Sequence, residues 1–343
     1  MRARRGRPRA PSFQSDTVEG TVRALVVSNM LPDAAHPERG RFVRDQVAAL
    51  RELDGVDVEL YEFSPGGRGL APAAVALRQG FAGGRRLRSP RGSRPRFDVV
   101  HAHFGLTAWP ALPVPARVRA LTVHGTDLCH PRTRLATRAV LPRIDLPAAA
   151  SATLVQQLPG RAARRRAQVL PCGVDLDRFY RLDRASARHE LGLEPGLPYL
   201  LFPSDPARAE KRYDRALALS RASEVELLTL GGVDPARVVT WINAANAVIV
   251  PSEREGFGLA VLEALACDVP VLATPAGIHP EALAGLDGAL CAPFELSSWR
   301  AALAQHLRAA DPRVDGRASA ERFSSRPMAA RVAAAWRASL GCR

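Results

Sequence analysis

The sequence almost lacks lysine, because Lys211 is the only lysine among 48 basic residues. A bias toward Arg, Ala, Gly and Pro is typical of genome composition, so most arginine positions need only a positive charge. Lys211 is then either a chance occurrence or a position that needs a compact ammonium group in place of a flat guanidinium. A point charge against phosphate oxygens is one such need. The surrounding residues must decide between these interpretations.

Closely spaced cysteine pairs are also missing. The five cysteines are far apart in the chain and form no Cys-x-x-Cys pair; they are Cys129, Cys172, Cys267, Cys291 and Cys342. This pattern argues against a disulfide framework and against a zinc site. It predicts a reducing, cytoplasmic environment.

No apolar stretch is long enough to span a bilayer. The most apolar region, residues 259–278, is interrupted by two acidic residues and two prolines, Glu263, Asp268, Pro270 and Pro275. The basic N-terminus is followed by PSFQSDTVEG, which is not the apolar core of a signal peptide. We therefore expect residues 1–20 to be a disordered basic extension.

Acidic residues are too few to balance the arginines, and the formal charge is +14 with a pI near 10.9. Such a balance predicts an anionic partner. Arginines cluster in residues 1–10, in residues 85–96 and at 161–166. Neither of the first two clusters contains an aromatic residue to stack on bases, so the pattern does not favour single-stranded nucleic acid. An anionic membrane surface fits it better.

Short apolar runs alternate with amphipathic stretches from residue 21 onward, which predicts an α/β fold with parallel sheets. Expected strands are residues 22–28, 56–63, 97–103, 119–125, 198–204, 225–230, 246–252, 269–274 and 288–291. Expected helices are residues 41–53, 211–222, 235–245 and 258–267, with another after Pro327. We expect two doubly wound domains, residues 21–172 and 173–325, whose strand ends face one cleft.

Residues 251–274 carry the strongest functional pattern. Gly256 and Gly258 flank Phe257 at an expected helix start, where bare N–H groups favour an anion. Glu255 and Glu263 are hydrogen-bond acceptors suited to hydroxyl groups. A ligand that offers both a phosphate to the helix start and several hydroxyl groups to the two acids is a nucleotide sugar. The alternative is that Glu255 is a helix N-terminal charge and Glu263 a solvated helix position.

Glu255 and Glu263, with GFGLAVLEALACDVPVLAT between and after them, resemble the E-x7-E signature of retaining glycosyltransferases. These are enzymes of the GT-B type, with two facing Rossmann-like domains, in the large family-four group (glycosyl transferases group 1). The resemblance extends over LVVSNMLPDAAHPERGRFVRDQVAAL, VVHAHFG, LTVHGTDL, VLPCGVDLDRF and AGIHPEAL. It implies that the terminal helix, residues 326–343, packs back on the first domain.

The resemblance implies roles for individual residues on the donor side. Glu263 would bind the ribose hydroxyls, Glu255 the donor sugar, and Arg208 with Lys211 the diphosphate. The backbone around the turn would meet the sugar and diphosphate, which makes Gly256, Phe257, Gly258 and Leu259 donor-binding. Gly40 would stand for the family's glycine-rich loop near the diphosphate, although relatives often carry two glycines there.

His124 resembles a family residue near the donor sugar and the acceptor, and is expected to be catalytic. It could instead be a histidine satisfied at a strand end. Asp127 could orient His124, take an acceptor hydroxyl or cap a turn. His101 and His103 alternate on one strand, so at most one faces the cleft, and we favour His103 on the acceptor side. The DLDRF run has Asp-x-Asp spacing but lies in the interdomain passage, so no metal is expected.

The resemblance predicts a retaining glycosyltransferase that moves a sugar from a nucleotide-diphosphate donor to a lipid-linked or polysaccharide acceptor. Two alternatives remain: a nucleotide-sugar epimerase of the same fold, and a catalytically degraded relative that only binds a sugar nucleotide. Expected partners are the donor, a glycan or lipid-linked acceptor and an anionic membrane surface, with no nucleic acid. The expected location is the cytoplasm, at the inner face of the cell membrane.

Overall fold

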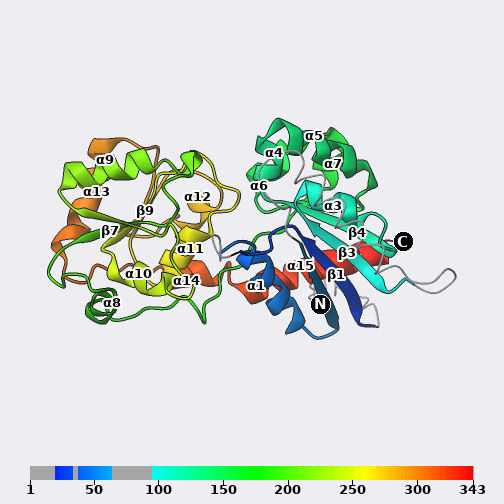
Figure 1. The fold of residues 1–343 in the computed structure, drawn as a ribbon, viewed down its shortest axis with the longest axis horizontal. Helices are drawn as coiled ribbons and strands as arrows, with labels where there is room; N and C mark the ends of the chain where they lie inside the picture. Colours follow the sequence, from blue (N-terminus) through cyan, green and yellow to red (C-terminus); the bar gives the residue numbers. More distant parts are fainter. Residues whose placement is uncertain (1–19, 34–37, 64–94, 343) are drawn as a thin grey trace, which may run out of the picture.

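The computed structural model describes residues 20–33, 38–63 and 95–342. The expected basic extension at residues 1–20 and the arginine cluster at residues 85–96 lie almost wholly outside the described residues. Figure 1 shows two α/β units side by side, joined by extended segments and by the last helices of the chain.

The first unit is built on a six-stranded parallel sheet in the order β2-β1-β3-β4-β5-β6. Its strands are β1 Val22–Ser28, β2 Val56–Glu62, β3 Phe97–His103, β4 Ala116–Val123, β5 Leu146–Ala149 and β6 Gln168–Val169. Its helices are α1 Arg41–Arg51, α3 Gly105–Ala111, α4 Thr126–Cys129, α5 Pro131–Val140, η1 Leu141–Arg143, α6 Ala152–Gln157 and α7 Arg161–Arg166.

The second unit is built on a five-stranded parallel sheet in the order β11-β10-β9-β7-β8. Its strands are β7 Tyr199–Phe202, β8 Glu226–Thr229, β9 Ala247–Val250, β10 Val271–Ala273 and β11 Leu290–Cys291. Its helices are α8 Arg184–Leu191, η2 Ala209–Lys211, α9 Tyr213–Ser223, α10 Val238–Ala244, α11 Leu259–Ala266, α12 His279–Ala282, α13 Leu296–Arg308 and α14 Arg317–Glu321.

Both sheets have buried cores on their two faces, which confirms the doubly wound α/β fold. The strands β7 and β9 are buried at every position, as expected for central strands of parallel sheets. In each sheet the strand order reverses beside the first strand, β1 or β7. Ligands of such folds bind where the loops on either side of that reversal separate.

The last helix, α15 Ser325–Gly341, packs on the first unit against α1, β4 and β5. Trp336 is completely buried in the first unit's core. Its indole N–H donates to Nδ1 of His101 at 3.2 Å, so the packing also satisfies a polar group. The chain thus leaves the second unit and completes the core of the first.

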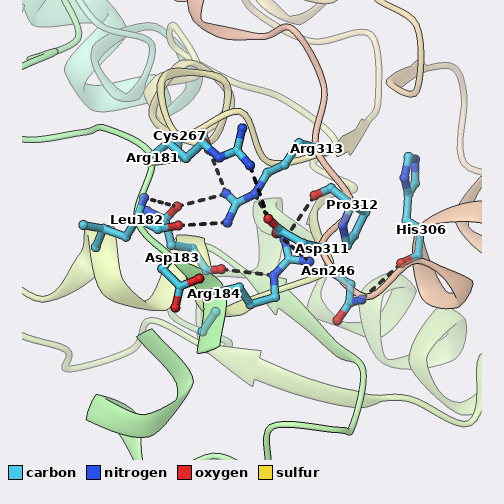
Figure 2. Close-up of polar contacts among 12 residues, drawn as sticks. Arg181, Leu182, Asp183, Arg184, Asn246, Cys267, His306, Asp311, Pro312 and Arg313 are labelled. Atoms are coloured by element: carbon cyan, nitrogen blue, oxygen red, sulfur yellow. Dashed lines mark hydrogen bonds and ion pairs between the residues drawn. The ribbon is translucent and has the colours of Figure 1, made fainter. Parts of the chain in front are cut away.

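Two extended segments connect the units, and arginine side chains tie them together. Val174 pairs with Ser324 in an isolated parallel bridge between the outgoing and returning segments. Figure 2 shows Arg313 and Arg184 in the same connection. Arg313 donates to the Leu182 carbonyl at 3.0 Å, and Arg184 donates to that of Pro312 at 3.1 Å. The outgoing segment, residues 173–184, and the returning segment, residues 311–324, are thus bound to each other. We call these two segments together the strap.

The structure corrects the sequence expectations at three strands. The expected strand 119–125 begins at Ala116 and ends at Val123, before the two residues that turn into α4. The strands β5 and β6 were not expected. β5 reads LPAA, and alanine and proline carry no strand signal, so only its burial between β4 and β6 makes it a strand.

We predict that Trp336→Ala lowers the free energy of unfolding by about 3–5 kcal/mol, because it opens a cavity in the core between α15 and the first sheet. Urea denaturation measures the change. Arg331→Ala, at an exposed position of the same helix, is the control and should stay within about 0.5 kcal/mol of the wild type. Equal losses in the two variants would contradict a special role for Trp336.

Candidate functional site

A cavity of about 370 Å³ lies between the two units. Its walls come from α1, from the strap, and from the loops that follow β7, β8 and β9. Of the residues singled out in the sequence, six line it: Arg208, Lys211, Glu255, Gly258, Leu259 and Glu263. The loops on both sides of the second sheet's reversal therefore converge on one space, as the fold requires.

Lys211 and Glu255 form a buried ion pair in this cavity. The Lys211 ammonium lies 2.6 Å from Oε2 of Glu255, and their side chains are 14% and 7% exposed. Burial opposes the charge of Glu255, but the Lys211 ammonium outweighs it, with further contributions from His279 and Ser252, and holds the pKa of Glu255 below its ordinary value. The only lysine of the chain thus neutralises the first acid of the signature. An arriving phosphate would compete with Glu255 for the ammonium.

Arg208 also reaches the cavity, but its guanidinium is engaged within its own loop. Its Nε and Nη2 atoms lie 3.1 and 2.8 Å from Oε1 of Glu210. The side chain is 51% exposed, so this ion pair is accessible to solvent. Pairs of this kind are weak, and the Arg208 guanidinium can therefore turn to a bound anion at small cost.

Glu263 is the only charged residue of α11, whose sequence LAVLEALA is otherwise apolar. Burial raises the pKa of Glu263 to about 7, with Arg178 opposing the rise and Asp45 adding to it. Both terminal nitrogens of Arg178 donate to the carboxylate of Asp45 in α1, Nη1 to Oδ1 at 3.2 Å and Nη2 to Oδ2 at 2.8 Å. An ion pair between the first unit and the strap therefore lies beside the second acid of the signature.

Close packing of the protein on itself accounts for several of the expected glycines. A Cβ atom on Gly256 would lie 2.0 Å from the carbonyl oxygen of His124, across the two units. A Cβ on Gly258, whose φ is +106°, would lie 2.5 Å from Nε2 of His279. Gly40 is equally confined, because its Cβ would lie 2.2 Å from the Met30 carbonyl oxygen. Neither Gly40 nor Gly256 lines the cavity.

Phe257 is buried with only 5% exposure, and it too does not line the cavity. Its carbonyl accepts the Ile278 N–H at 2.7 Å, which joins the turn before α11 to the loop before α12. The structure thus places the centre of the Gly-Phe-Gly turn in the core. Gly258 and Leu259, at the start of α11, are the part of the turn that faces the cavity.

His124 lies at the junction of the units, but its ring nitrogens face protein atoms. Its Nε2 lies 2.9 Å from Nδ1 of His103, and its Nδ1 lies 3.9 Å from Sγ of Cys172. The rings of Phe42 and Phe104 cover it, each with centroids 4.8 Å away. Burial and the neighbouring histidines hold the pKa of His124 well below its ordinary value, so the ring is neutral.

The structure corrects two expectations, that His101 and His103 lie on opposite faces of their strand and that His103 faces the cleft. Residues two apart on a strand share a face, and these two rings stack with centroids 4.9 Å apart. Both are fully buried and neither lines the cavity, because β3 is covered on both faces. His103 supports His124 from behind, and burial lowers the pKa of His103 to about 3. His101 bonds Thr122 at 2.8 Å and accepts from Trp336.

Asp127 caps the turn at the start of α4, one of the alternatives left open above. Its carboxylate accepts backbone N–H groups of His124, Gly125 and Gly105 at 2.9–3.4 Å. Burial raises the pKa of Asp127 to about 6 despite these bonds. The side chain is 3% exposed, so it holds the loop that carries His124 and is not on the cavity surface.

Sequence reasoning missed three residues of the site. Arg178 and Asp45 are more than one hundred residues apart, and no local pattern links them. His279 belongs to the AGIHPEAL segment; its Nδ1 bonds the Thr274 carbonyl at 2.8 Å and its buried Nε2 has no partner among the described atoms. A histidine two residues after Gly277, within a segment already recognised, was the available signal.

The Asp-x-Asp run does not form a cation site. Asp175 accepts the N–H groups of Asp177 and Arg178 at 3.0 and 3.1 Å and so caps a turn of the strap. In the described ranges, no group of three or more His, Cys, Asp or Glu side chains is arranged to hold a metal ion. Nor does any helix there combine the length and apolar character needed to cross a membrane.

Two family models match the chain, one on each unit. Residues 208–322 match "Glycosyl transferases group 1", and residues 40–178 match "Glycosyltransferase Family 4". The chain is 34% identical over 275 residues to D-inositol 3-phosphate glycosyltransferase of Actinosynnema mirum, covering 62% of this chain and 66% of that protein. It is 30% identical to the Mycolicibacterium gilvum protein of the same name, covering 66% and 62%. The chain thus spans under two thirds of these relatives.

Solved structures share the fold. Sucrose-phosphate synthase of Thermosynechococcus elongatus superposes with a TM-score of 0.69 at 18% identity, covering 94% of this chain and all of that one. Anabaena HepE in complex with UDP and glucose superposes with a TM-score of 0.61 at 16% identity, covering 91% and 98%. At these identities the likeness shows the GT-B fold alone.

The raised pKa of Glu263 predicts a pH dependence of stability. Between about 4.5 and about 7 the folded protein keeps a proton that the unfolded chain has lost. The free energy of unfolding should therefore fall as pH rises through this window, by about 1–3 kcal/mol. Glu263→Gln removes this contribution. The difference in free energy of unfolding, variant minus wild type, should therefore be more positive at pH 7 than at pH 5. Urea denaturation at the two pH values measures it.

The control for this prediction is Glu253→Gln, at an exposed position of the loop after β9. Its stability should change with pH as that of the wild type does. A Glu263→Gln protein with an unchanged pH slope would show that the carboxyl group ionises in the folded state as freely as in water.

Proposed function

Because the chain belongs to the glycosyl transferases of group 1, we propose that it transfers a sugar from a nucleotide-diphosphate donor to an acceptor hydroxyl, with retention of configuration. The observation that carries the proposal is the convergence of Lys211, Glu255 and Glu263 on one cavity between two Rossmann-like units. A cationic group and two hydroxyl-binding acids in one space match a ligand that carries both phosphates and a polyol.

The donor is proposed to lie along the second unit. Apolar residues after β8 and in α10, among them Leu230, Val233 and Val238, line the cavity and could cover a nucleobase. Glu263 would accept the ribose hydroxyls and Glu255 those of the sugar. The N–H groups at the start of α11 and the cations of Lys211 and Arg208 would hold the diphosphate. UDP is the first nucleotide to test, because the similar HepE structure contains UDP.

Departure of the leaving group is proposed to rest on fixed charges. Lys211 would exchange the Glu255 carboxylate for the diphosphate, so its charge stabilises the phosphate oxygens as the sugar bond breaks. The freed Glu255 would then accept from the sugar hydroxyls. The diphosphate can take the acceptor's proton on the face from which it leaves. We expect no metal, because Lys211, Arg208 and the helix N–H groups supply the counter-charge.

The acceptor is proposed to enter from the first unit, past Phe42 and Arg41 of α1. His124 is expected near the reacting sugar, although its side chain must turn from His103 to offer a nitrogen. Lipid-linked and polysaccharide acceptors are proposed. The names of the relatives specify a small phosphorylated polyol as the acceptor of those proteins, so an inositol phosphate is the second acceptor to test. The proposed location is the cytoplasm at the inner face of the cell membrane.

The direct test is incubation with radiolabelled UDP-, GDP- and ADP-sugars together with a membrane lipid extract and with inositol phosphate. Transfer of label to either acceptor is the expected result. An epimerised donor would support the epimerase alternative. Donor binding without turnover would indicate a degraded relative, and both of these outcomes contradict the proposal.

Lys211→Arg should weaken donor binding by about tenfold or more, because the planar guanidinium cannot replace a point charge between Glu255 and the diphosphate. Calorimetry with the UDP-sugar measures the affinity. The reciprocal control is Arg221→Lys at an exposed position of α9, which should bind as the wild type does. Unchanged affinity in Lys211→Arg would show that the position does not need a compact ammonium group and that the single lysine is a chance occurrence.

A further inference from the structure

The first unit carries an arginine surface that the proposed reaction does not use. Residues 128–170 contain eight arginines and a single acidic residue, Asp145. The arginines lie on and around three helical elements, α5, η1 and α7: they are Arg132, Arg134, Arg138, Arg143, Arg161, Arg164, Arg165 and Arg166. We call these side chains the arginine face.

The arginine face is exposed and its charge is not neutralised. Seven of the eight residues are exposed, and Arg164 is partly so. Elsewhere arginines often meet acids, as in the pairs Arg44–Glu62 and Arg178–Asp45. On this face the bonded guanidinium groups, such as those of Arg143 and Arg164, reach only backbone carbonyls. Among the described residues, none of the eight pairs with a carboxylate.

The helices of this face lie together. Figure 1 draws α5 and α7 next to each other in the first unit, with α4 and α6 toward the second unit. A hydrogen bond agrees with this view, because the Arg166 guanidinium donates to the Ile144 carbonyl after η1, at 3.5 Å. Leu135 projects from α5 between Arg134 and Arg138 and is 66% exposed, more than the other large apolar side chains that the structure describes as exposed.

We propose that the arginine face adsorbs to an anionic phospholipid bilayer, with Leu135 entering the headgroup region. Several unpaired arginines on adjacent helices match a surface of negative charge that is continuous in two dimensions. An exposed leucine among them would gain apolar contact on entering the headgroup region of such a surface. Residues 128–170 contain no Phe, Tyr or Trp, so the face lacks the stacking groups that single-stranded nucleic acid requires.

The position of the face relates adsorption to the cavity. The helix α4 begins one residue after Gly125, which lies against Gly256 of the second unit, and α5 follows α4 directly. A bilayer on α5 and α7 would therefore lie near the junction of the two units, on the other face of the first sheet from α1 (Figure 1). The inference that the acceptor is membrane-bound rests on the proposed function, whereas the adsorption itself does not.

The test is co-sedimentation of the full chain with vesicles. The wild type should bind vesicles of phosphatidylcholine with an equal part of phosphatidylglycerol, bind pure phosphatidylcholine poorly, and dissociate as salt is raised. Reversing four charges of the face, with Arg132→Glu, Arg138→Glu, Arg161→Glu and Arg165→Glu, should weaken binding by a factor on the order of ten or more. Leu135→Ser should weaken it by about threefold.

Matched controls separate the face from the net charge of the whole protein. Arg221→Glu, Arg300→Glu, Arg308→Glu and Arg331→Glu change the net charge equally at exposed positions of α9, α13 and α15. Leu197→Ser removes a leucine of the second unit that is 52% exposed. The charge control should bind vesicles within about threefold of the wild type, and Leu197→Ser should bind them as the wild type does.

Three outcomes would overturn the proposal: equal losses in the face and control variants, no preference of the wild type for the anionic vesicles, or displacement of the vesicles by a short RNA at low concentration. Donor binding by calorimetry is measured on the same variants and should not change. Loss of membrane binding with intact donor binding is then distinguishable from failure of the proposed function. Circular dichroism confirms that each variant is folded.

Discussion

The close approach of two backbones at Gly256 is the constraint on which the site depends. The loop after β9 passes so near the His124 carbonyl that a single added carbon would collide with it. This contact places the carboxyl ends of the two sheets opposite each other. Asp45 and Arg178 reinforce it from α1 and the strap. With the units so placed, residues from five separate segments enclose one cavity, and neither unit could form it alone.

The charges inside that cavity compensate one another in the free protein. Lys211 satisfies Glu255, Arg208 satisfies Glu210, and Arg178 satisfies Asp45. Lys211, Glu255, Arg178 and Asp45 are largely buried, and burying one of these four charges alone would cost several kcal/mol. Their pairing therefore allows these groups to remain charged in the absence of a ligand. Glu263 is the exception, since it forms no ion pair with any residue that the structure describes and burial keeps its proton to about pH 7. A polyanion with hydroxyl groups can replace these internal partners one by one.

Arginine serves three different purposes in this chain. In the strap, Arg184 and Arg313 use the planar guanidinium to reach several carbonyls at once, which a lysine could not do. Around the cavity, arginines pair with carboxylates. On α5 and α7 they are left unpaired at the surface. Lysine is retained at one position, against a buried carboxylate, where a compact charge fits.

The sequence determined the fold class and both sheets' central strands, and it singled out six residues that line the cavity. Apolar runs, glycine positions and the Glu255–Glu263 spacing are local patterns, which a sequence shows directly. It also indicated that Lys211 was special. It did not reveal β5, whose LPAA run becomes a strand only by burial between neighbours. It also placed His103 on the cleft, although the strand is covered on both faces.

Only the tertiary structure decided which side chains meet. The Arg178–Asp45 pair, the His279 beneath Gly258 and the Trp336–His101 bond join residues from distant segments. Short-range periodicity fixes the face of a helix or strand on which a residue lies. It does not fix the residue opposite, because that depends on how the two units and the returning helix pack in three dimensions.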